Sequence, residues 1–313
     1  MKSVQRILRP AGLLSLAGLA LAGAMLSAPA TAPAQSGSDQ FATLPSSLTL
    51  YGVVRDFKGR NESGGHPDFQ YQPTAGFGMY ANMVADQLDQ DGKPVFRSQG
   101  NRVSSQARDA QGRNIIPTRK EYMATRSGDV ASSVATSNGG ALSTSANFAQ
   151  WYRDVPGTNL SRIVPIVLTR QPNTNIYSFS DRTDPGFSSL GGFFPINGQL
   201  FGNTPGQSRN FGFTFEVETE FVYKRGTGQS FTFTGDDDVW VFIDNRLVVD
   251  LGGVKGALSQ SVDLDRLSWL QDNQTYKLKL FFAERHTTQS NVRIDTTINL
   301  KAVDPPPVTG LFD

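Results

Sequence analysis

Apolar and polar residues alternate along much of the chain between residues 48 and 300. The clearest run lies at residues 211–223, where nearly every second position carries a large apolar side chain: Phe211, Phe213, Phe215, Val217, Phe221 and Tyr223. A period of two places these side chains on one face of a β-strand. An aromatic stripe can also form a platform for sugar rings, but this regular spacing favours inward packing in a sandwich core.

Weaker copies of the same alternation predict further strands, separated by turns rich in glycine and proline. We expect them at residues 48–57, 162–169, 176–179, 229–234, 239–243, 247–249, 276–282 and 292–300. A short helix is expected over residues 147–153, with Phe148, Trp151 and Tyr152 facing inward. The pattern therefore predicts an all-β fold, an antiparallel β-sandwich with long loops and one or two short helices.

The first 34 residues have the layout of a signal peptide. Lys2, Arg6 and Arg9 precede an apolar segment at residues 11–26, and small residues with a cleavage pattern end at Ala34. The apolar run is short for a membrane span, so no stable span is expected after cleavage, although an uncleaved anchor is the competing interpretation. We predict an exported protein, extracellular, on the cell surface or in the periplasm.

The remaining chain is predicted to form one large β domain. Residues 35–47 are small and polar and indicate a flexible lead-in, and residues 48–303 carry the strand pattern. Within them, residues 98–144 are rich in Ser, Arg, Asn, Gly and Thr, which indicates a polar insertion of long surface loops. Residues 304–313 form a C-terminal tail that begins with a proline run.

Charge and cysteine content narrow the possible functions. Removing the signal peptide leaves 26 basic against 28 acidic residues, without a basic run, which does not favour nucleic-acid binding. The chain contains no cysteine, which excludes thiol catalysis and disulfides. Its stability must therefore come from a core that about 280 residues are long enough to build.

Three consecutive acids, Asp236, Asp237 and Asp238, fall at the turn between two predicted strands. Adjacent like charges repel one another, so a compact turn holds them most easily when a cation or many hydrogen-bond donors face them. Because the ligands on offer are hard oxygens and not sulfur, the cation expected is calcium. The alternative is an ordinary solvated turn, in which aspartates bond to nearby main chain.

The residues around this turn also resemble a known family. The run at residues 235–243, Gly-Asp-Asp-Asp-Val-Trp-Val-Phe-Ile, followed by Val-Asp-Leu-Gly-Gly at 249–253, is similar to the signature of the fibro-slime domain, a member of the PA14 group. Further similar segments include residues 148–157 and 281–286. The resemblance covers about residues 48–300 and implies a β-sandwich of the PA14 jelly-roll type.

The resemblance also implies a binding site. In sugar-binding members of the PA14 group, two consecutive aspartates and a second loop hold calcium, which in turn coordinates sugar hydroxyls. By resemblance the metal ligands are Asp236, Asp237 and, on the second loop, Glu284. The residues assigned to ligand binding are Asp238, Arg285, His286 and Asn291, the last three as hydrogen-bonding partners of a polyol.

Three functions remain open at this point. The resemblance favours a secreted, calcium-dependent carbohydrate-binding or adhesion module without enzymatic activity. The second hypothesis is a structural matrix protein in which calcium only rigidifies the loops. The third is a glycoside hydrolase, which would need a carboxyl pair drawn from Asp236, Asp238 and Glu284. Each site residue also has a structural interpretation: Glu284 and Arg285 can pair with neighbours, His286 can be an ordinary loop residue, and Asn291 can stabilise its turn.

Overall fold

The computed structural model describes residues 39–117, 123, 125–305 and 308. The predicted signal peptide, residues 1–34, lies outside the described residues. In the described part of the chain, no helix has the length and hydrophobicity that crossing a membrane requires.

Eleven of the described strands form one antiparallel sheet. In spatial order its path runs through β12 (Arg246–Leu251), β11 (Asp238–Ile243), β14 (Thr275–Glu284), β9 (Phe213–Val222), β1 (Ser47–Phe57), β7 (Asn159–Arg170), β8 (Tyr177–Ser180), β15 (Val292–Thr296), β10 (Ser230–Gly235) and β13 (Leu258–Asp263), and β16 (Lys301–Ala302) pairs with β9. The predicted antiparallel all-β fold is therefore confirmed.

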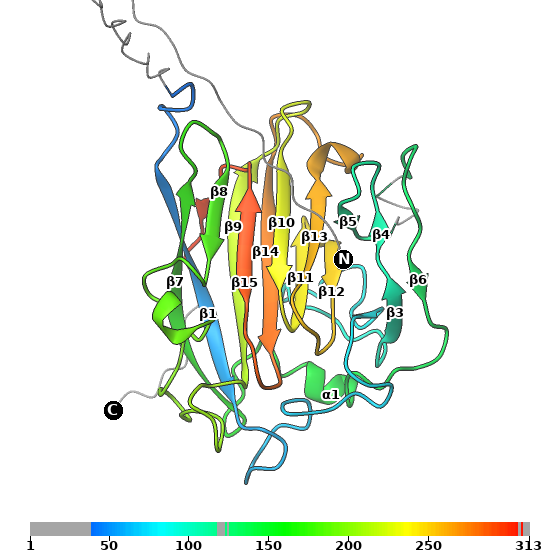
Figure 1. Cartoon of the computed structure of the whole chain (residues 1–313), viewed down its shortest axis with the longest axis vertical. Helices are drawn as coiled ribbons and strands as arrows, with labels where there is room; N and C mark the ends of the chain where they lie inside the picture. Colours follow the sequence, from blue (N-terminus) through cyan, green and yellow to red (C-terminus); the bar gives the residue numbers. More distant parts are fainter. Residues whose placement is uncertain (1–38, 118–122, 124, 306–307, 309–313) are drawn as a thin grey trace, which may run out of the picture. The chain divides into compact units, whose positions relative to one another are not determined.

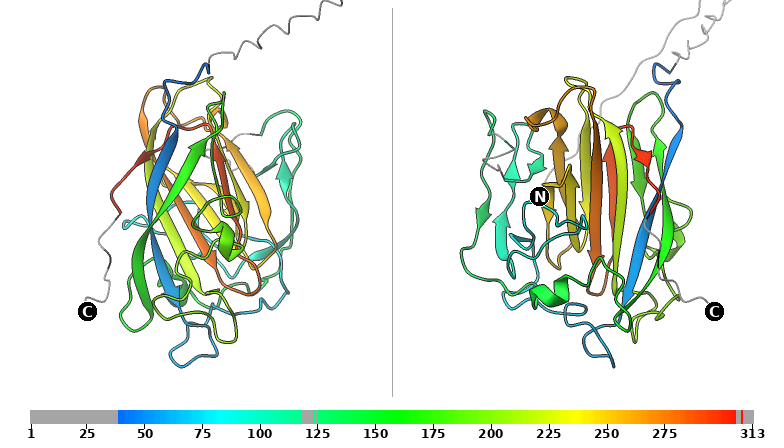
Figure 2. Two further views of the ribbon diagram at one scale, coloured as in Figure 1. Left: turned by 60° about the vertical axis from the view of Figure 1, so that its left-hand side comes forward. Right: turned by 180° about the vertical axis from the view of Figure 1, so that it is seen from behind.

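This sheet curves back on itself so that its two halves face each other as the layers of a sandwich (Figures 1 and 2). Phe233 on β10 packs against Phe282 on β14, with ring centroids 6.3 Å apart, which joins the two layers through the core. At the ends of the path, the side-chain Oε1 of Gln260 on β13 accepts a hydrogen bond of 2.7 Å from the main-chain N of Asp250 on β12. The sheet is thus nearly closed, because its two end strands, β12 and β13, lie next to each other.

Aromatic side chains fill the core. The six residues of the alternating run at 211–223 are all buried, so their predicted inward packing is confirmed. Phe193, from the loop before β9, contacts Phe213, Phe215 and Phe282. Aromatic rings of this size bury large areas without a polar group to satisfy, which lets the chain build a stable core without disulfides.

The segment between β1 and β7 lies beside the sheet and contains short elements. These are β2 (Tyr80–Ala81), β3 (Asn101–Ser105), β4 (Ala107–Arg108), β5 (Asn114–Ile115), β6 (Ser133–Val134) and α1 (Ser145–Phe148). Two 3₁₀ helices, Ser188–Leu190 and Leu264–Arg266, lie elsewhere in the chain. The helix α1 starts two residues before the predicted range and ends at Phe148. Thr144 caps its start, its side chain accepting a hydrogen bond from the main-chain N of Asn147.

The described part of the predicted lead-in is attached to the sheet. Residues 39–46 form turns, and the carboxylate of Asp39 lies 2.7 Å from the guanidinium of Arg170 at the end of β7. The main-chain O of Pro45 also accepts a hydrogen bond from the hydroxyl of Tyr177. The small, polar composition of this segment does not reveal these contacts, because both partners lie more than a hundred residues away.

Candidate functional site

Three connections between the two layers meet at one end of the sandwich. Residues 236–237 join β10 to β11, residues 252–257 join β12 to β13, and residues 285–291 join β14 to β15. The strand register brings them together, because Gly235 lies opposite Val292 and Asp238 lies opposite Ala283. Asp236 and Asp237 are therefore held between the two ends of the 285–291 loop.

Asp236 is buried and bound by Asn291. Its two carboxylate oxygens accept hydrogen bonds from the main-chain N and, at 2.8 Å, from the side-chain Nδ2 of Asn291. Burial raises the pKa of Asp236, while the bonds from Asn291 oppose the rise. The Oδ1 of Asn291 accepts a hydrogen bond from Arg182, so the Asn291 amide orients the carboxylate of Asp236 and has both its ends engaged.

Asp237 is held by main-chain donors of the two other connections. Its Oδ1 accepts from the N of Lys255 at 3.0 Å, and its Oδ2 accepts from the N of Arg285 at 3.2 Å. Burial raises the pKa of Asp237 to about 7, and the neighbouring Asp238 carboxylate adds to this rise, while Arg285 and Lys255 oppose it. The carboxylate is thus fixed in position but poorly matched in charge.

Asp238 and Arg285 form an ion pair in the interior, behind the two aspartates. The Nε of Arg285 lies 2.6 Å from the Oδ2 of Asp238, and both side chains are 0% exposed. The guanidinium also donates to the main-chain oxygens of Asp68 and Ala141 and lies over the ring of Trp151. These two residues were predicted to bind ligand; the structure places them in the framework that supports the site.

Glu284, the last residue of β14, is completely buried beside the aspartates. Its Oε1 accepts a long hydrogen bond from the main-chain N of His286, at 3.4 Å, while its Oε2 has no hydrogen-bond partner. Burial raises the pKa of Glu284 well above its usual range, and the carboxylates of Asp237 and Asp236 add to the rise. A buried, unpartnered carboxylate oxygen is costly unless a proton or a cation reaches it.

Lys255 places a positive charge among these acids. Its Nζ donates to the main-chain oxygen of Asp237, and the side chain is 9% exposed. Burial lowers the pKa of Lys255, while Asp237, Asp238, Asp236 and Glu284 oppose this. The position of the ammonium shows that part of the negative charge is met from within the chain.

We use the name acidic cluster for six buried side chains: Asp236, Asp237, Asp238, Glu284, Lys255 and Arg285. When all six are ionised, the four carboxylates exceed the two cations by two negative charges. Excess charge is expensive in a buried setting, where it is relieved by protonation or by a bound cation. The fully ionised cluster therefore has an excess of negative charge that one divalent cation would neutralise.

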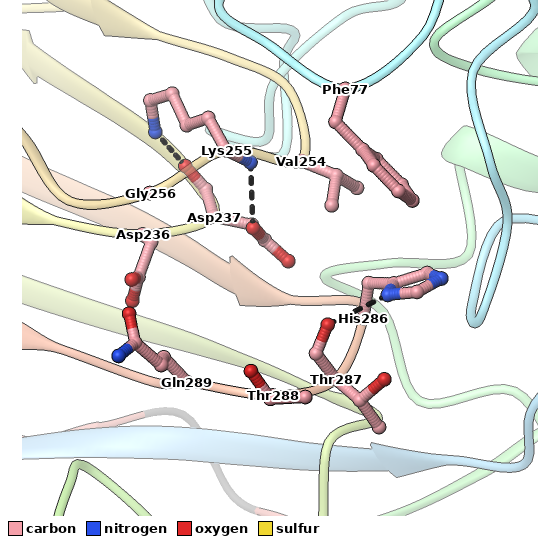
Figure 3. A pocket seen from close by; sticks show the side chains of 10 residues that line it. All are labelled: Phe77, Asp236, Asp237, Val254, Lys255, Gly256, His286, Thr287, Thr288 and Gln289. Atoms are coloured by element: carbon pink, nitrogen blue, oxygen red, sulfur yellow. Dashed lines mark hydrogen bonds between the residues drawn. The ribbon is translucent and has the colours of Figure 1, made fainter.

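A cavity of about 200 Å³ opens above the cluster (Figure 3). Asp236, Asp237 and Lys255 form one wall, and His286 with the threonines that follow it forms the opposite wall. Phe77, from the loop before β2, completes the lining. Carboxylates, hydroxyls and an aromatic ring thus surround one small space.

His286 is the predicted ligand-binding residue that does line the cavity. Its Nδ1 lies 2.8 Å from the main-chain oxygen of Thr287, and its ring meets the ring of Phe77 edge-on, with centroids 4.9 Å apart. Asn291 lies beside Asp236 and is absent from the lining. The structure therefore brings Asp236, Asp237 and His286 to the cavity.

The fit of this site to calcium can be judged from its donors. The carboxylates of Asp236 and Asp237 offer oxygen ligands to a cation in the cavity, and the excess of two negative charges in the fully ionised cluster matches a divalent ion. In the described residues, however, no group of three or more His, Cys, Asp or Glu side chains is arranged to hold a metal ion. Asp236 and Asp237 would therefore need main-chain oxygens, water or a ligand to complete the six to eight contacts that calcium takes.

Sequence reasoning missed Phe77 as a lining residue and gave no role to Lys255. Phe77 belongs to a loop that carries no motif, and it is far from the aspartates along the chain. Lys255 comes two residues after the Gly-Gly of the resemblance motif and is 17 residues away from Asp238 along the chain, so nothing local links it to the three acids.

Comparison with known proteins supports the predicted resemblance. Residues 199–307 match the PA14 domain. The chain is 33% identical to protein psiR of Dictyostelium discoideum over 267 residues, which cover 81% of this chain and 21% of psiR. It is 39% identical to protein psiQ of the same organism over 166 residues, or 49% of this chain and 16% of psiQ. The chain thus matches about a fifth or less of the length of these relatives.

Among solved structures, the PA14 domain of the MpAFP antifreeze protein is similar to this chain, with 8% identity and a TM-score of 0.22. The similarity covers 29% of this chain and 53% of the solved chain. A likeness this weak carries no argument by itself. The match over residues 199–307 includes β9 to β16 and every member of the acidic cluster. Together with the antiparallel sandwich and the similarity to the psi proteins, it identifies residues 199–307 as a PA14-like domain.

Proposed function

We propose that this chain is an exported carbohydrate-binding or adhesion module that holds calcium at Asp236 and Asp237 and takes a sugar in the cavity above them. The observation that carries the proposal is the charge of the acidic cluster. Its carboxylates are fixed by hydrogen bonds, yet they exceed their internal cations by two charges, and the Oε2 of Glu284 has no partner. A site built only for stability would match its buried charges.

The residues of the chain have separate tasks in this proposal. Asp236 and Asp237 hold the ion, and Asn291 and the main-chain N of Lys255 keep their carboxylates in place. The Asp238–Arg285 pair anchors the turn from behind. Calcium would supply coordination positions that vicinal sugar hydroxyls can fill without proton transfer.

Two other functions compete with this one. In a structural matrix protein, calcium would rigidify the three connections and no sugar would bind. A glycoside hydrolase needs two carboxyls about 5–10 Å apart that flank the scissile bond. Of the three acids considered for that role, Asp238 is paired with Arg285 in the interior and Glu284 is fully buried, so the geometry gives the hydrolase less support.

The test is a calcium titration of the secreted protein by calorimetry, with thermal melting in calcium, in magnesium and in chelator. We expect calcium to raise the melting temperature, since a ligand at 100 times its Kd stabilises the folded state by about 2.7 kcal/mol. Asp236→Ala and Asp237→Ala should each abolish this increase. Asp91→Ala is the control, because its side chain is 74% exposed and lies outside the cluster.

Binding to a glycan array then separates the functions. Glycan binding that disappears with chelator supports the proposal. Stabilisation by calcium without any glycan signal favours the structural matrix protein, and turnover of a chromogenic glycoside favours the hydrolase. An identical melting temperature in calcium and in chelator would contradict the calcium site.

A further inference from the structure

Phe77 exposes its ring at the edge of the cavity although the main chain around it is tightly held. The side chain is 43% exposed. The main-chain O of Phe77 accepts a hydrogen bond from Arg102 at 3.1 Å, and the N of Gly78 donates to the O of Val254 at 2.8 Å. An exposed large ring on a fixed main chain is a pre-organised contact surface, because little conformational freedom remains to be lost on binding.

The predicted polar insertion supports this loop. Arg102 on β3 also bonds the main-chain O of Ala75, and the N of Ala75 donates to the O of Gly139. Both partners belong to residues 98–144, for which the sequence indicated only surface loops. The insertion therefore fixes the position of Phe77 relative to the site.

Apolar and polar groups both line the cavity (Figure 3). Phe77 and Val254 form an apolar corner, and the ring of Phe77 meets the ring of His286 there. Asp236 and Asp237 lie across the cavity from this corner. A ligand that fills the space must present C–H groups to one side and hydroxyls to the other.

We propose that Phe77 is the stacking platform for one terminal hexopyranose, a proposal that rests on the carbohydrate-binding function above. A pyranose ring carries C–H groups on its face and hydroxyls at its edge, which matches the two sides of the cavity. The volume of about 200 Å³ lies below the roughly 300–1,000 Å³ of pockets for drug-sized ligands, so it admits one ring at the end of a glycan.

The test compares three variants of the secreted protein with the wild type, in the presence of calcium. Binding is first screened on an array that displays terminal neutral hexoses, sialic acids and uronic acids. The Kd of each variant is then measured for the neutral sugar that the wild type binds best. Phe77→Ala should weaken binding about tenfold, and Phe77→Tyr, which keeps the ring, should bind like the wild type. Tyr51→Ala is the matched control, because Tyr51 is 44% exposed on β1 and does not line the cavity. All three should keep the calcium-dependent rise in melting temperature.

The outcomes separate the stacking role of Phe77 from the carbohydrate-binding function on which it rests. If the wild type binds neutral hexoses and Phe77→Ala binds them equally well, the platform is refuted while the carbohydrate-binding function stands. If the wild type binds no glycan on the array, both proposals fail together.

Discussion

The acidic cluster differs from a second group of charges, buried or half-buried, which lies where β1 and β9 meet the loops around residues 93 and 154. In that group, the guanidinium of Arg55 lies 2.7 Å from Asp154 and 2.8 Å from Glu216, and the Nζ of Lys93 lies 2.6 Å from Glu216. We call these four residues the Glu216 network. Its two cations meet two carboxylates, whereas the acidic cluster sets four carboxylates against two cations.

The difference shows what each group can do. A matched network contributes to the fold when its partners stay together, and it leaves no charge for an outside ion. The acidic cluster keeps the Asp238–Arg285 pair as its matched part, while Asp236, Asp237 and Glu284 share one lysine. Excess charge at the end where loops enclose a cavity is therefore what the proposed calcium site requires, and the comparison can be tested by removing single charges.

The largest effect is expected in the Glu216 network. Glu216→Gln leaves Arg55 and Lys93 with one carboxylate fewer, and losing one partner of a buried ion pair destabilises by about 3–5 kcal/mol. Urea denaturation should show this loss in the free energy of unfolding, equally with calcium and with chelator. A dependence of the loss on calcium would contradict the separation of the two groups.

Glu218→Gln is the matched control on the same strand. Glu218 also pairs with two lysines, but its side chain is 26% exposed against 10% for Glu216, and one of its partners, Lys277, is 56% exposed. Exposed pairs contribute about 0–1 kcal/mol, so this variant should unfold nearly like the wild type. A loss as large as that of Glu216→Gln would show that burial is not what gives the network its strength.

The sequence predicted the fold well where one strand face is buried and the other is not. The second half of the run at 211–223 has this character, because residues 218, 220 and 222 are partly exposed. Residues 213–217 are all buried, and there the apolar alternation alone indicated the inward face. In the insertion, the strands β4, β5 and β6 have two residues each, too few to show a period. Their positions depend on distant partners, such as the bridge between Arg108 and Val130, which no local pattern reveals.

The site was predictable only in part for a related reason. Asp236 and Asp237 were found because three adjacent acids are conspicuous. All six residues of β11 are buried, so the alternation could not show that Asp238 points to the interior and pairs with Arg285. Phe77 reaches the cavity through hydrogen bonds to Arg102 and through the contact of Gly78 with Val254, which are long-range contacts.

Asp56 is a buried carboxylate with uncharged hydrogen-bond partners, so it differs both from the acidic cluster and from the Glu216 network. Asp56 accepts hydrogen bonds from the main-chain N of Phe201 and the side chain of Asn210, and burial raises its pKa to about 7 while these bonds oppose the rise. Because the folded state holds this proton more tightly than the unfolded state, stability is fully present below about pH 4 and is lost as the pH rises towards 7.

Asp56→Asn should remove this part of the pH dependence. Between pH 4 and pH 7, the wild type should lose about 2–4 kcal/mol more unfolding free energy than the variant, since each pKa unit corresponds to about 1.4 kcal/mol. Urea denaturation at several pH values measures the difference, in which the contributions of all other groups cancel. Parallel pH curves would contradict the raised pKa of Asp56.

The smallest effect is expected at Glu284, and it has the opposite sign to that at Glu216. In chelator at pH 8, Glu284→Gln removes one excess negative charge and should raise the unfolding free energy by about 1 kcal/mol, because an amide avoids the burial of an unpartnered carboxylate oxygen. Asp238→Asn, in the same cluster, should instead destabilise the protein, since it breaks the buried pair with Arg285. If both variants lose stability in chelator, the carboxylates of the cluster are already matched within the chain, and the argument for a cation at Asp236 and Asp237 fails.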